Sequence, residues 1–120
     1  MTADEPELLV ESRQEWRDWL VANHATSEGV WVVTWKRPTG RPRPTYEDLV
    51  EEAVCFGWID SVVRSFDEER HGQRMTPRRK RSKWSDSNRA RVERLEAAGL
   101  MTEAGRAAVE RAKLEGTWLR

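Results

Sequence analysis

The sequence predicts an α+β fold, in which a small antiparallel sheet of about three to four strands packs with about four helices. Apolar residues recur at helical spacing behind Ser or Thr caps in four segments, and stretches rich in β-branched and aromatic residues lie between them. A chain of 120 residues, 38% of them hydrophobic, has room for one domain with one compact core. We therefore interpret residues 1–120 as a single domain and expect residues 1–7 to be disordered.

The first elements are a strand, a helix and a second strand. Residues 8–10 form a short apolar strand, and Ser12 with Glu15 three positions later is a capping box that opens a helix. The buried side of this helix is expected to carry Trp16, Trp19 and Leu20. Residues 30–36 are rich in Val and Trp on both faces, which predicts an interior strand covered on both sides.

The middle of the chain predicts a loop, a helix and a hairpin. Residues 37–44 contain three prolines and one glycine, so they form a loop. Thr45 and Asp48 then open a helix that Gly57 ends. The next elements are a strand over 58–66, a polar turn over 67–72 and an antiparallel return over 73–76.

The last third predicts an exposed loop followed by two helices. Residues 77–83 are too basic to be buried and form the loop. Ser85 caps a third helix that ends at Gly99, and Thr102 caps a fourth helix that Gly116 closes.

Charge is unevenly distributed, although the formal net charge is zero. Residues 1–28 hold seven acids and two bases, and residues 29–69 hold eight acids and five bases. Residues 70–120 reverse this balance, with six acids and fourteen bases. In one interpretation the acidic parts dock on the basic part; in the other, a basic face attracts an external anion.

Several function classes are not supported by the sequence. Cys55 is the single cysteine and lies among apolar residues, while His24 and His71 lack metal-ligand spacing, so we expect no metal and no cofactor. No apolar stretch approaches the roughly 20 residues that span a membrane. The acidic start of the chain does not resemble a secretory signal, so a cytoplasmic location is expected.

The main candidate site is a basic loop. Residues 70–85 hold seven Lys or Arg and no acid, and they run into Trp84 and a capped helix start. Guanidinium groups, an indole face and a helix N-terminus suit binding of phosphate or carboxylate. The candidate residues here are Arg74, Arg78, Arg79, Arg81, Trp84, Ser85 and Asn88. In the alternative, Trp84 is a core residue and the arginines pair with acids elsewhere, such as Glu47, Glu51, Glu52 or the acidic N-terminal segment.

A second candidate group lies on the strand over 58–66. Alternation places Trp58, Asp60 and Arg64 on one face. These residues either line a pocket or belong to a cross-strand ion-pair network. An enzyme would need a nucleophile with a base, but no histidine lies near Ser61 in the sequence, so no catalytic residue is assigned.

Two long motifs resemble the YdeI/OmpD-associated (bacteriocin-protection) family. They are residues 45–61 and 74–85, and the similarity extends over most of residues 8–118. The resemblance implies a link to outer-membrane porins and to protection against bacteriocins and cationic antimicrobial peptides, but it carries over no catalytic residue. Its motif positions are Trp58, Asp60, Arg74, Pro77, Arg78, Arg81, Trp84 and Ser85.

Three hypotheses follow for the function. The first is a non-enzymatic module with a stress or antimicrobial-resistance role, whose basic loop binds a nucleotide, nucleic acid, lipid head group or acidic protein. The second is a small enzyme with a pocket formed by Trp58, Asp60, Arg64 and Trp84. The third is a protein that forms homo-oligomers through exposed tryptophans.

Overall fold

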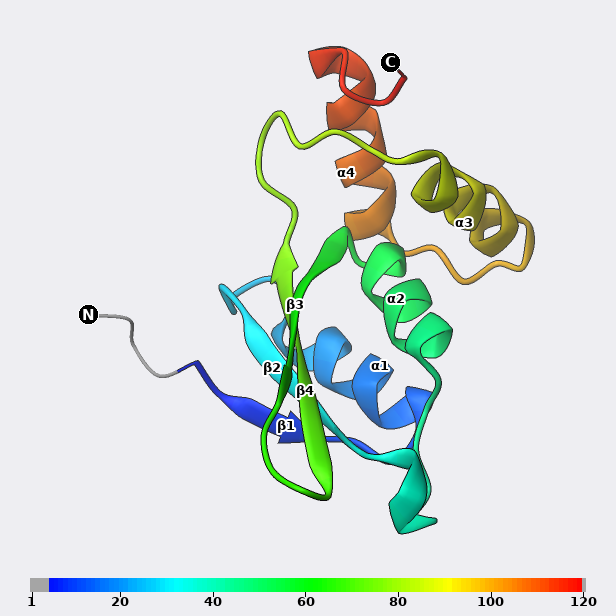
Figure 1. Cartoon of the computed structure of the whole chain (residues 1–120). Helices are drawn as coiled ribbons and strands as arrows, with labels where there is room; N and C mark the ends of the chain where they lie inside the picture. Colours follow the sequence, from blue (N-terminus) through cyan, green and yellow to red (C-terminus); the bar gives the residue numbers. More distant parts are fainter. Residues whose placement is uncertain (1–4, 120) are drawn as a thin grey trace.

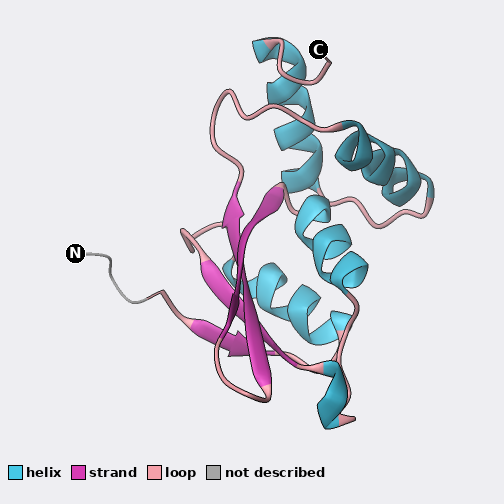
Figure 2. Cartoon of the chain, viewed as in Figure 1, coloured by secondary structure: helices cyan, strands magenta, loops and turns pink. Residues whose placement is uncertain are grey.

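A computed structural model describes residues 5–119 as a four-stranded sheet with four α-helices (Figures 1 and 2). The helices α1 and α2 cover one face of the sheet, and α3 and α4 both pack against α2 (Figure 1). The α+β class is therefore confirmed. The elements in chain order are β1 (Glu7–Leu9), α1 (Arg13–Asn23), β2 (Val30–Trp35), a 3-10 turn (Arg37–Thr39), α2 (Tyr46–Cys55), β3 (Trp58–Ser65), β4 (Arg70–Pro77), α3 (Asp86–Ala97) and α4 (Glu103–Glu115).

The sheet has the order β1-β2-β4-β3 and is mostly antiparallel. Its edge strand β1 differs, because it runs parallel to β2, with Leu8 opposite Val32. The helix α1 between them returns the chain to the end of the sheet where β1 began, as a parallel pair requires. The interior position predicted for residues 30–36 is confirmed, because β2 lies between β1 and β4. The predicted cover on both faces is wrong, since the helices lie on one face and Trp31 on the other face is only half-buried. The β3–β4 hairpin is confirmed, although β4 already begins at Arg70.

The predicted helix starts are present. Each N-cap hydroxyl accepts a hydrogen bond from the backbone three residues on, at Ser12, Thr45, Ser85 and Thr102. The box formed by Thr45 and Asp48 is reciprocal. At Ser12 only half of the predicted box forms, because the Glu15 carboxylate accepts from the backbone N–H of Glu11.

The core lies between the sheet, α1 and α2 and is built around tryptophan. Trp16 is fully buried, stacks on Trp19 and meets the edge of Trp58. Its indole N–H donates to the carbonyl of Leu49 at 3.0 Å, which ties α1 to α2. Such aromatic pairs contribute about 0.5–1.5 kcal/mol beyond their buried area, which offsets the low aliphatic content.

At the chain start, residues 1–4 of the segment expected to be disordered lie outside the described residues. The expectation is wrong for residues 5–7. Glu5 forms two 2.7 Å hydrogen bonds with the guanidinium of Arg74, and Glu7 begins β1. An ion pair and a strand partner, which the sequence does not show, hold this segment.

Candidate anion-binding site

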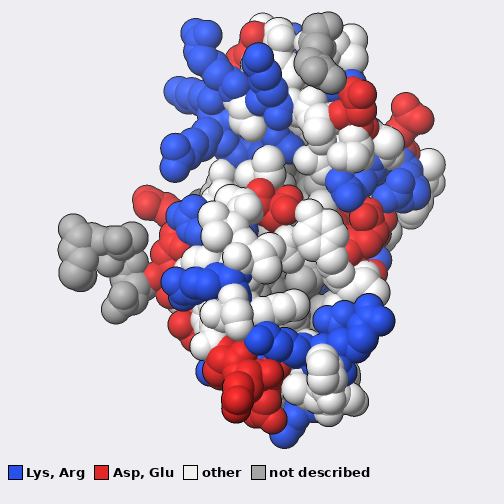
Figure 3. Space-filling model, in the orientation of Figure 1, with Lys and Arg blue, Asp and Glu red and all other residues white. Residues whose placement is uncertain are grey.

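The loop that links β4 to α3 carries a concentration of positive charge. Lys and Arg side chains gather over it at the upper left of Figure 3. Its exposed cations are Arg79, Lys80, Arg81 and Lys83, which we call the loop cations. Among residues 5–119, no carboxylate forms a salt bridge with any of them. Within the described part of the chain, the backbone N–H of Arg81 makes the carboxylate contact of this stretch and donates to Glu115 at 2.9 Å.

Elsewhere, many arginines are paired. The glutamates of α2 expected as partners for the basic loop are taken by other residues. Arg13 and Arg17 of α1 bind Glu52, at 2.6 and 2.8 Å. From α3, Arg91 and Arg94 bind Glu47. The predicted pairing of the loop with Glu47, Glu51 and Glu52 is therefore wrong.

Arg74, a predicted site residue, is neutralised internally. Its Nε and Nη2 atoms both donate to the carboxylate of Glu5. This bond lowers the pKa of Glu5, and the guanidinium lies on β4 rather than in the loop. For this one arginine, pairing with the acidic N-terminal segment is confirmed.

Arg78 is the unusual member of the group, because its guanidinium is buried without a carboxylate partner. Only 6% of its surface is exposed. Its Nη1 donates to Ser82 Oγ at 2.9 Å, and its Cζ lies 3.7 Å from the centre of the Trp84 ring. Its Nε and Nη2 have no hydrogen-bond partner among residues 5–119. Burial lowers the pKa of Arg78 to about 10, so the group is still charged at neutral pH.

Trp84 is a core residue and does not offer a face for stacking. It is 2% exposed, lies 5.1 Å from the ring of Trp118, and donates its backbone N–H to Thr117. The predicted role of this indole as an aromatic plate for a ligand is therefore wrong. Its ring is instead the surface on which the Arg78 guanidinium lies. The partner Trp118 was not singled out as a site residue, because its position in the C-terminal tail carries no motif.

Ser85 and Asn88 shape the start of α3. The Ser85 hydroxyl accepts from the backbone of Asn88 at 3.1 Å. The largely buried Asn88 side chain accepts from Arg91 at 2.8 Å. Both side chains have internal partners, so they hold the helix start and the end of the loop in place.

The residues predicted to share a face of β3 do not share it. A β-bulge lies between Asp60 and Val63, so Asp60 is opposite Met75 while Arg64 is opposite Gly72. Met75 and Gly72 are three positions apart on β4, so they point to opposite faces of the sheet, and so do their partners Asp60 and Arg64.

The contacts of these side chains agree with the strand register. Asp60 accepts from the Tyr46 hydroxyl at 2.9 Å on the helix side, whereas Arg64 lies 4.6 Å from the ring of Trp31 on the other side. Trp58 is 1% exposed and Trp84 is buried. The predicted pocket of Trp58, Asp60, Arg64 and Trp84 is therefore not formed.

A shallow hollow beside the loop brings Arg78 together with Arg111, a residue of α4 that the sequence did not single out. The hollow has a volume of about 370 Å³, and Trp58, Pro77 and His24 also line it. The Arg111 guanidinium donates to the carbonyl of Arg78 at 3.1 Å. No Asp or Glu belongs to its lining, so its charged groups are all basic.

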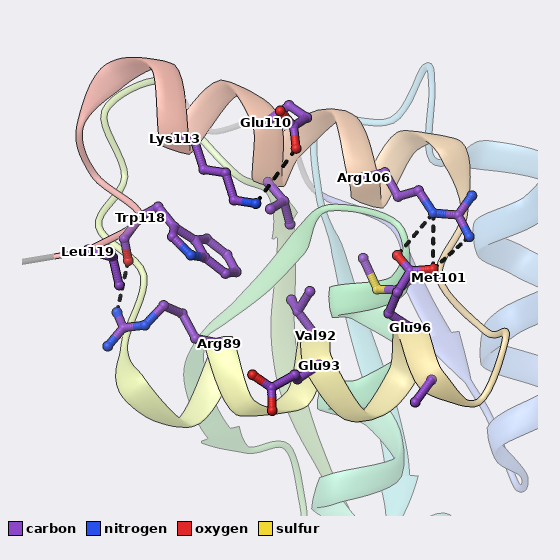
Figure 4. A pocket seen from close by; sticks show the side chains of 12 residues that line it. Arg89, Val92, Glu93, Glu96, Met101, Arg106, Glu110, Lys113, Trp118 and Leu119 are labelled. Atoms are coloured by element: carbon purple, nitrogen blue, oxygen red, sulfur yellow. Dashed lines mark hydrogen bonds and ion pairs between the residues drawn. The ribbon is translucent and has the colours of Figure 1, made fainter.

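A larger groove of about 840 Å³ opens between α3 and α4 (Figure 4). Its apolar part includes Val92, Met101 and Trp118. Three acids and three bases line it, and two pairs of them form salt bridges, Arg106 with Glu96 at 2.8 Å and Lys113 with Glu110 at 3.8 Å. The groove therefore carries little uncompensated charge, in contrast to the loop.

A family model described as a domain of unknown function, DUF8412, matches residues 8–108. The chain belongs to this family. The matched stretch includes the loop and Arg78, while Arg111 and Trp118 lie beyond it. Neither the curated proteins nor the solved structures contain a match. The DUF8412 description assigns no activity and does not link the chain to the YdeI/OmpD-associated family, so that resemblance stays a prediction.

The chemistry that this DUF8412 chain offers at the site is electrostatic. Within residues 5–119, no group of three or more His, Cys, Asp or Glu is arranged to hold a metal ion, and no helix is long and apolar enough to cross a membrane. Cys55 is buried, and burial raises the pKa of its thiol to about 11, which disfavours the nucleophilic thiolate. The loop presents cationic groups with free hydrogen-bond donors.

Proposed function

We propose that this protein is a non-enzymatic binding module whose loop cations bind an anionic ligand. The observation that carries the proposal is the set of exposed bases at positions 79, 80, 81 and 83, none of them in a salt bridge with the described residues. Like charges crowded into five positions repel one another, and a bound anion relieves that repulsion.

The way the loop is held supports this proposal. Arg78 lies on the ring of Trp84 at one end, and the backbone of Arg81 is tied to Glu115 of α4. Arg81 also has a positive φ of 64°, a conformation that a non-glycine residue keeps only where its surroundings stabilise it. A loop fixed in this way loses little conformational entropy on binding.

The biological role rests on the resemblance alone. A stress or bacteriocin-resistance role, a cytoplasmic location and a nucleotide, nucleic acid, lipid head group or acidic protein as partner remain predictions. Homo-oligomerisation also remains a prediction, which light scattering would test. We propose no catalytic function, because Arg64 lies on the opposite face of the sheet from Asp60.

The test uses a fluorescein-labelled oligothymidylate as a flexible polyanion probe, with anisotropy measured across a range of NaCl concentrations. A loop variant replaces Lys80, Arg81 and Lys83 with Gln. The matched control replaces three other exposed bases with Gln, namely Arg37, Arg41 and Arg64, so that both variants lose the same charge.

We expect the loop variant to reduce the slope of log K against log salt by about 2, since each phosphate contact on a single strand contributes about 0.7. The control should change the slope and affinity much less. Salt-insensitive binding by the unaltered protein, or equal losses in the two variants, would refute the proposal.

A further inference from the structure

In the part of the chain that the structure describes, the Nε–Nη2 edge of the Arg78 guanidinium lacks the carboxylate partner that the same edge has in Arg74 and Arg91. Arg74 directs this edge at Glu5, with both distances 2.7 Å, and Arg91 directs it at Glu47, at 2.8 and 2.9 Å. Each of these pairs is a two-point contact between a guanidinium and two coplanar oxygens. In Arg78 the same two donors are buried and meet no acceptor among residues 5–119.

Such an arrangement is costly for a folded protein. More than nine in ten buried polar groups in native structures have a hydrogen-bond partner, and a buried charge is normally paired. The contacts that Arg78 does make use Nη1 and the flat face of the group, through Ser82 and Trp84. They fix the guanidinium in place and leave its two-point edge unused.

The surroundings of Arg78 have the charge of an anion subsite. Arg111 lines the same hollow of about 370 Å³, whose lining contains no Asp or Glu. Among the described residues, the carboxylate of Asp60 favours the charge of Arg78, but it already accepts hydrogen bonds from Tyr46 and Gln73. The loop cations follow Arg78 directly in the chain, and the basic side chains gathered over this loop add further positive charge (Figure 3).

We propose that the Nε–Nη2 edge of Arg78 is a specific subsite for a phosphate group, and that the ligand of the module is a compact phosphate-bearing molecule. This inference rests on the proposed function and names its ligand class. A phosphate supplies two oxygens to the edge and keeps further oxygens and charge for Arg111 and the loop cations, whereas a single carboxylate would use both of its oxygens on Arg78.

The rest of the ligand is recognised mainly by charge. Trp84 is sealed in the interior, so the site has no free indole on which a nucleobase could stack. A chain of phosphates would instead run from Arg78 along the loop cations. Because the two donors are closed to solvent, binding requires a local movement at Ser82 and Lys83, which contact Arg78 through its Nη1, while the tie between the Arg81 backbone and Glu115 can stay in place.

Calorimetric titrations at constant ionic strength test the subsite with inorganic phosphate, tripolyphosphate and acetate as probes. The key variant is Arg78→Lys, which keeps the charge and loses the two-point edge. The matched control is Arg37→Lys, the same substitution at an exposed arginine outside the loop. Circular dichroism and a melting curve establish that each variant is folded, and Arg78→Met provides a second variant at the site.

We expect saturable one-to-one binding of phosphate, tighter binding of tripolyphosphate and much weaker binding of acetate. Arg78→Lys should weaken phosphate binding at least tenfold, while Arg37→Lys should leave it within about twofold. The loop variant should lose most of the advantage of tripolyphosphate over phosphate, and it should weaken phosphate binding less than Arg78→Lys does.

Other results would overturn the inference in distinguishable ways. Absence of saturable phosphate binding, with the salt-dependent polyanion binding intact, would refute the subsite and leave the proposed function standing. Equal effects of the two lysine variants would show that Arg78 is not the receptor. Acetate binding as tight as phosphate binding would reassign the subsite to carboxylates, and loss of both phosphate and polyanion binding in the unaltered protein would refute both proposals.

Discussion

Replacing Arg78 with Met should leave the free energy of unfolding almost unchanged, although the side chain is buried. Burial lowers the pKa of Arg78 to about 10. This lowering of the pKa on folding corresponds to a destabilisation of the folded state on the order of 3 kcal/mol at pH 7. The cation–π contact with Trp84 contributes about 2 kcal/mol and the bond to Ser82 about 1 kcal/mol. These contributions cancel, so the free energy of unfolding of Arg78→Met should lie within about 1 kcal/mol of that of the unaltered protein.

Urea unfolding followed by circular dichroism measures this difference, with no phosphate in the buffer. The matched control is Arg91→Met, which removes a two-point pair with Glu47 and should cost about 1–2 kcal/mol. A loss of 3 kcal/mol or more in Arg78→Met would refute the reasoning, because the guanidinium would then be satisfied and structural. A change of less than about 1 kcal/mol in the free energy of unfolding would mean that the fold does not require this arginine, as expected for a residue that serves ligand binding.

Three further predictions concern the packing and the ionisable groups. Gly105→Ala should lower the free energy of unfolding by about 2–3 kcal/mol in urea, because its Cβ would clash with the carbonyl oxygen of Cys55. Gly99 has a positive φ but no neighbour within 4 Å of an added Cβ, so Gly99→Ala should cost only about 1 kcal/mol. Cys55, with its thiol pKa raised to about 11, should react with a disulfide reagent at pH 8 far more slowly in the native protein than in urea, and equal rates would contradict its burial. Arg74 lowers the pKa of Glu5, so this carboxylate stabilises the fold above about pH 4 and the contribution is lost as the pH falls through the lowered value. Glu5→Gln should therefore flatten the acid side of the stability profile, and an unchanged profile would count against the pair.

The helices were predictable because their ends are encoded locally. A hydroxyl cap such as Thr45 and a left-handed glycine such as Gly57 act within a few residues of sequence, so the pattern alone gives the start and end of α2. The parallel pairing of β1 was not predictable in this way. It depends on how α1 crosses over, which is a property of the whole fold.

The site was harder to predict, because two of its features are not local. The bulge in β3 shifts the alternation after Asp60 and moves Arg64 to the other face, although the sequence around it reads as regular strand. The burial of Trp84 depends on Trp118, which lies 34 positions further along the chain. A basic run followed by tryptophan therefore predicted the loop correctly and its aromatic plate wrongly.

The segregation of charge along the chain has two explanations, and each applies to a different part of the structure. On α3, Arg91 and Arg94 face the acids of α2, and on β4 Arg74 faces Glu5, so here the acidic and basic parts neutralise each other. The loop lies at the end of the sheet near α4 (Figure 1), while the glutamates of α2 are paired with arginines of α1 and α3. Its contact with the acid Glu115 is made by the backbone, and no salt bridge to an acid among residues 5–119 engages the side chains of the loop cations. Position in the fold, rather than composition, is what separates the arginines that stabilise this protein from those that remain available to a ligand.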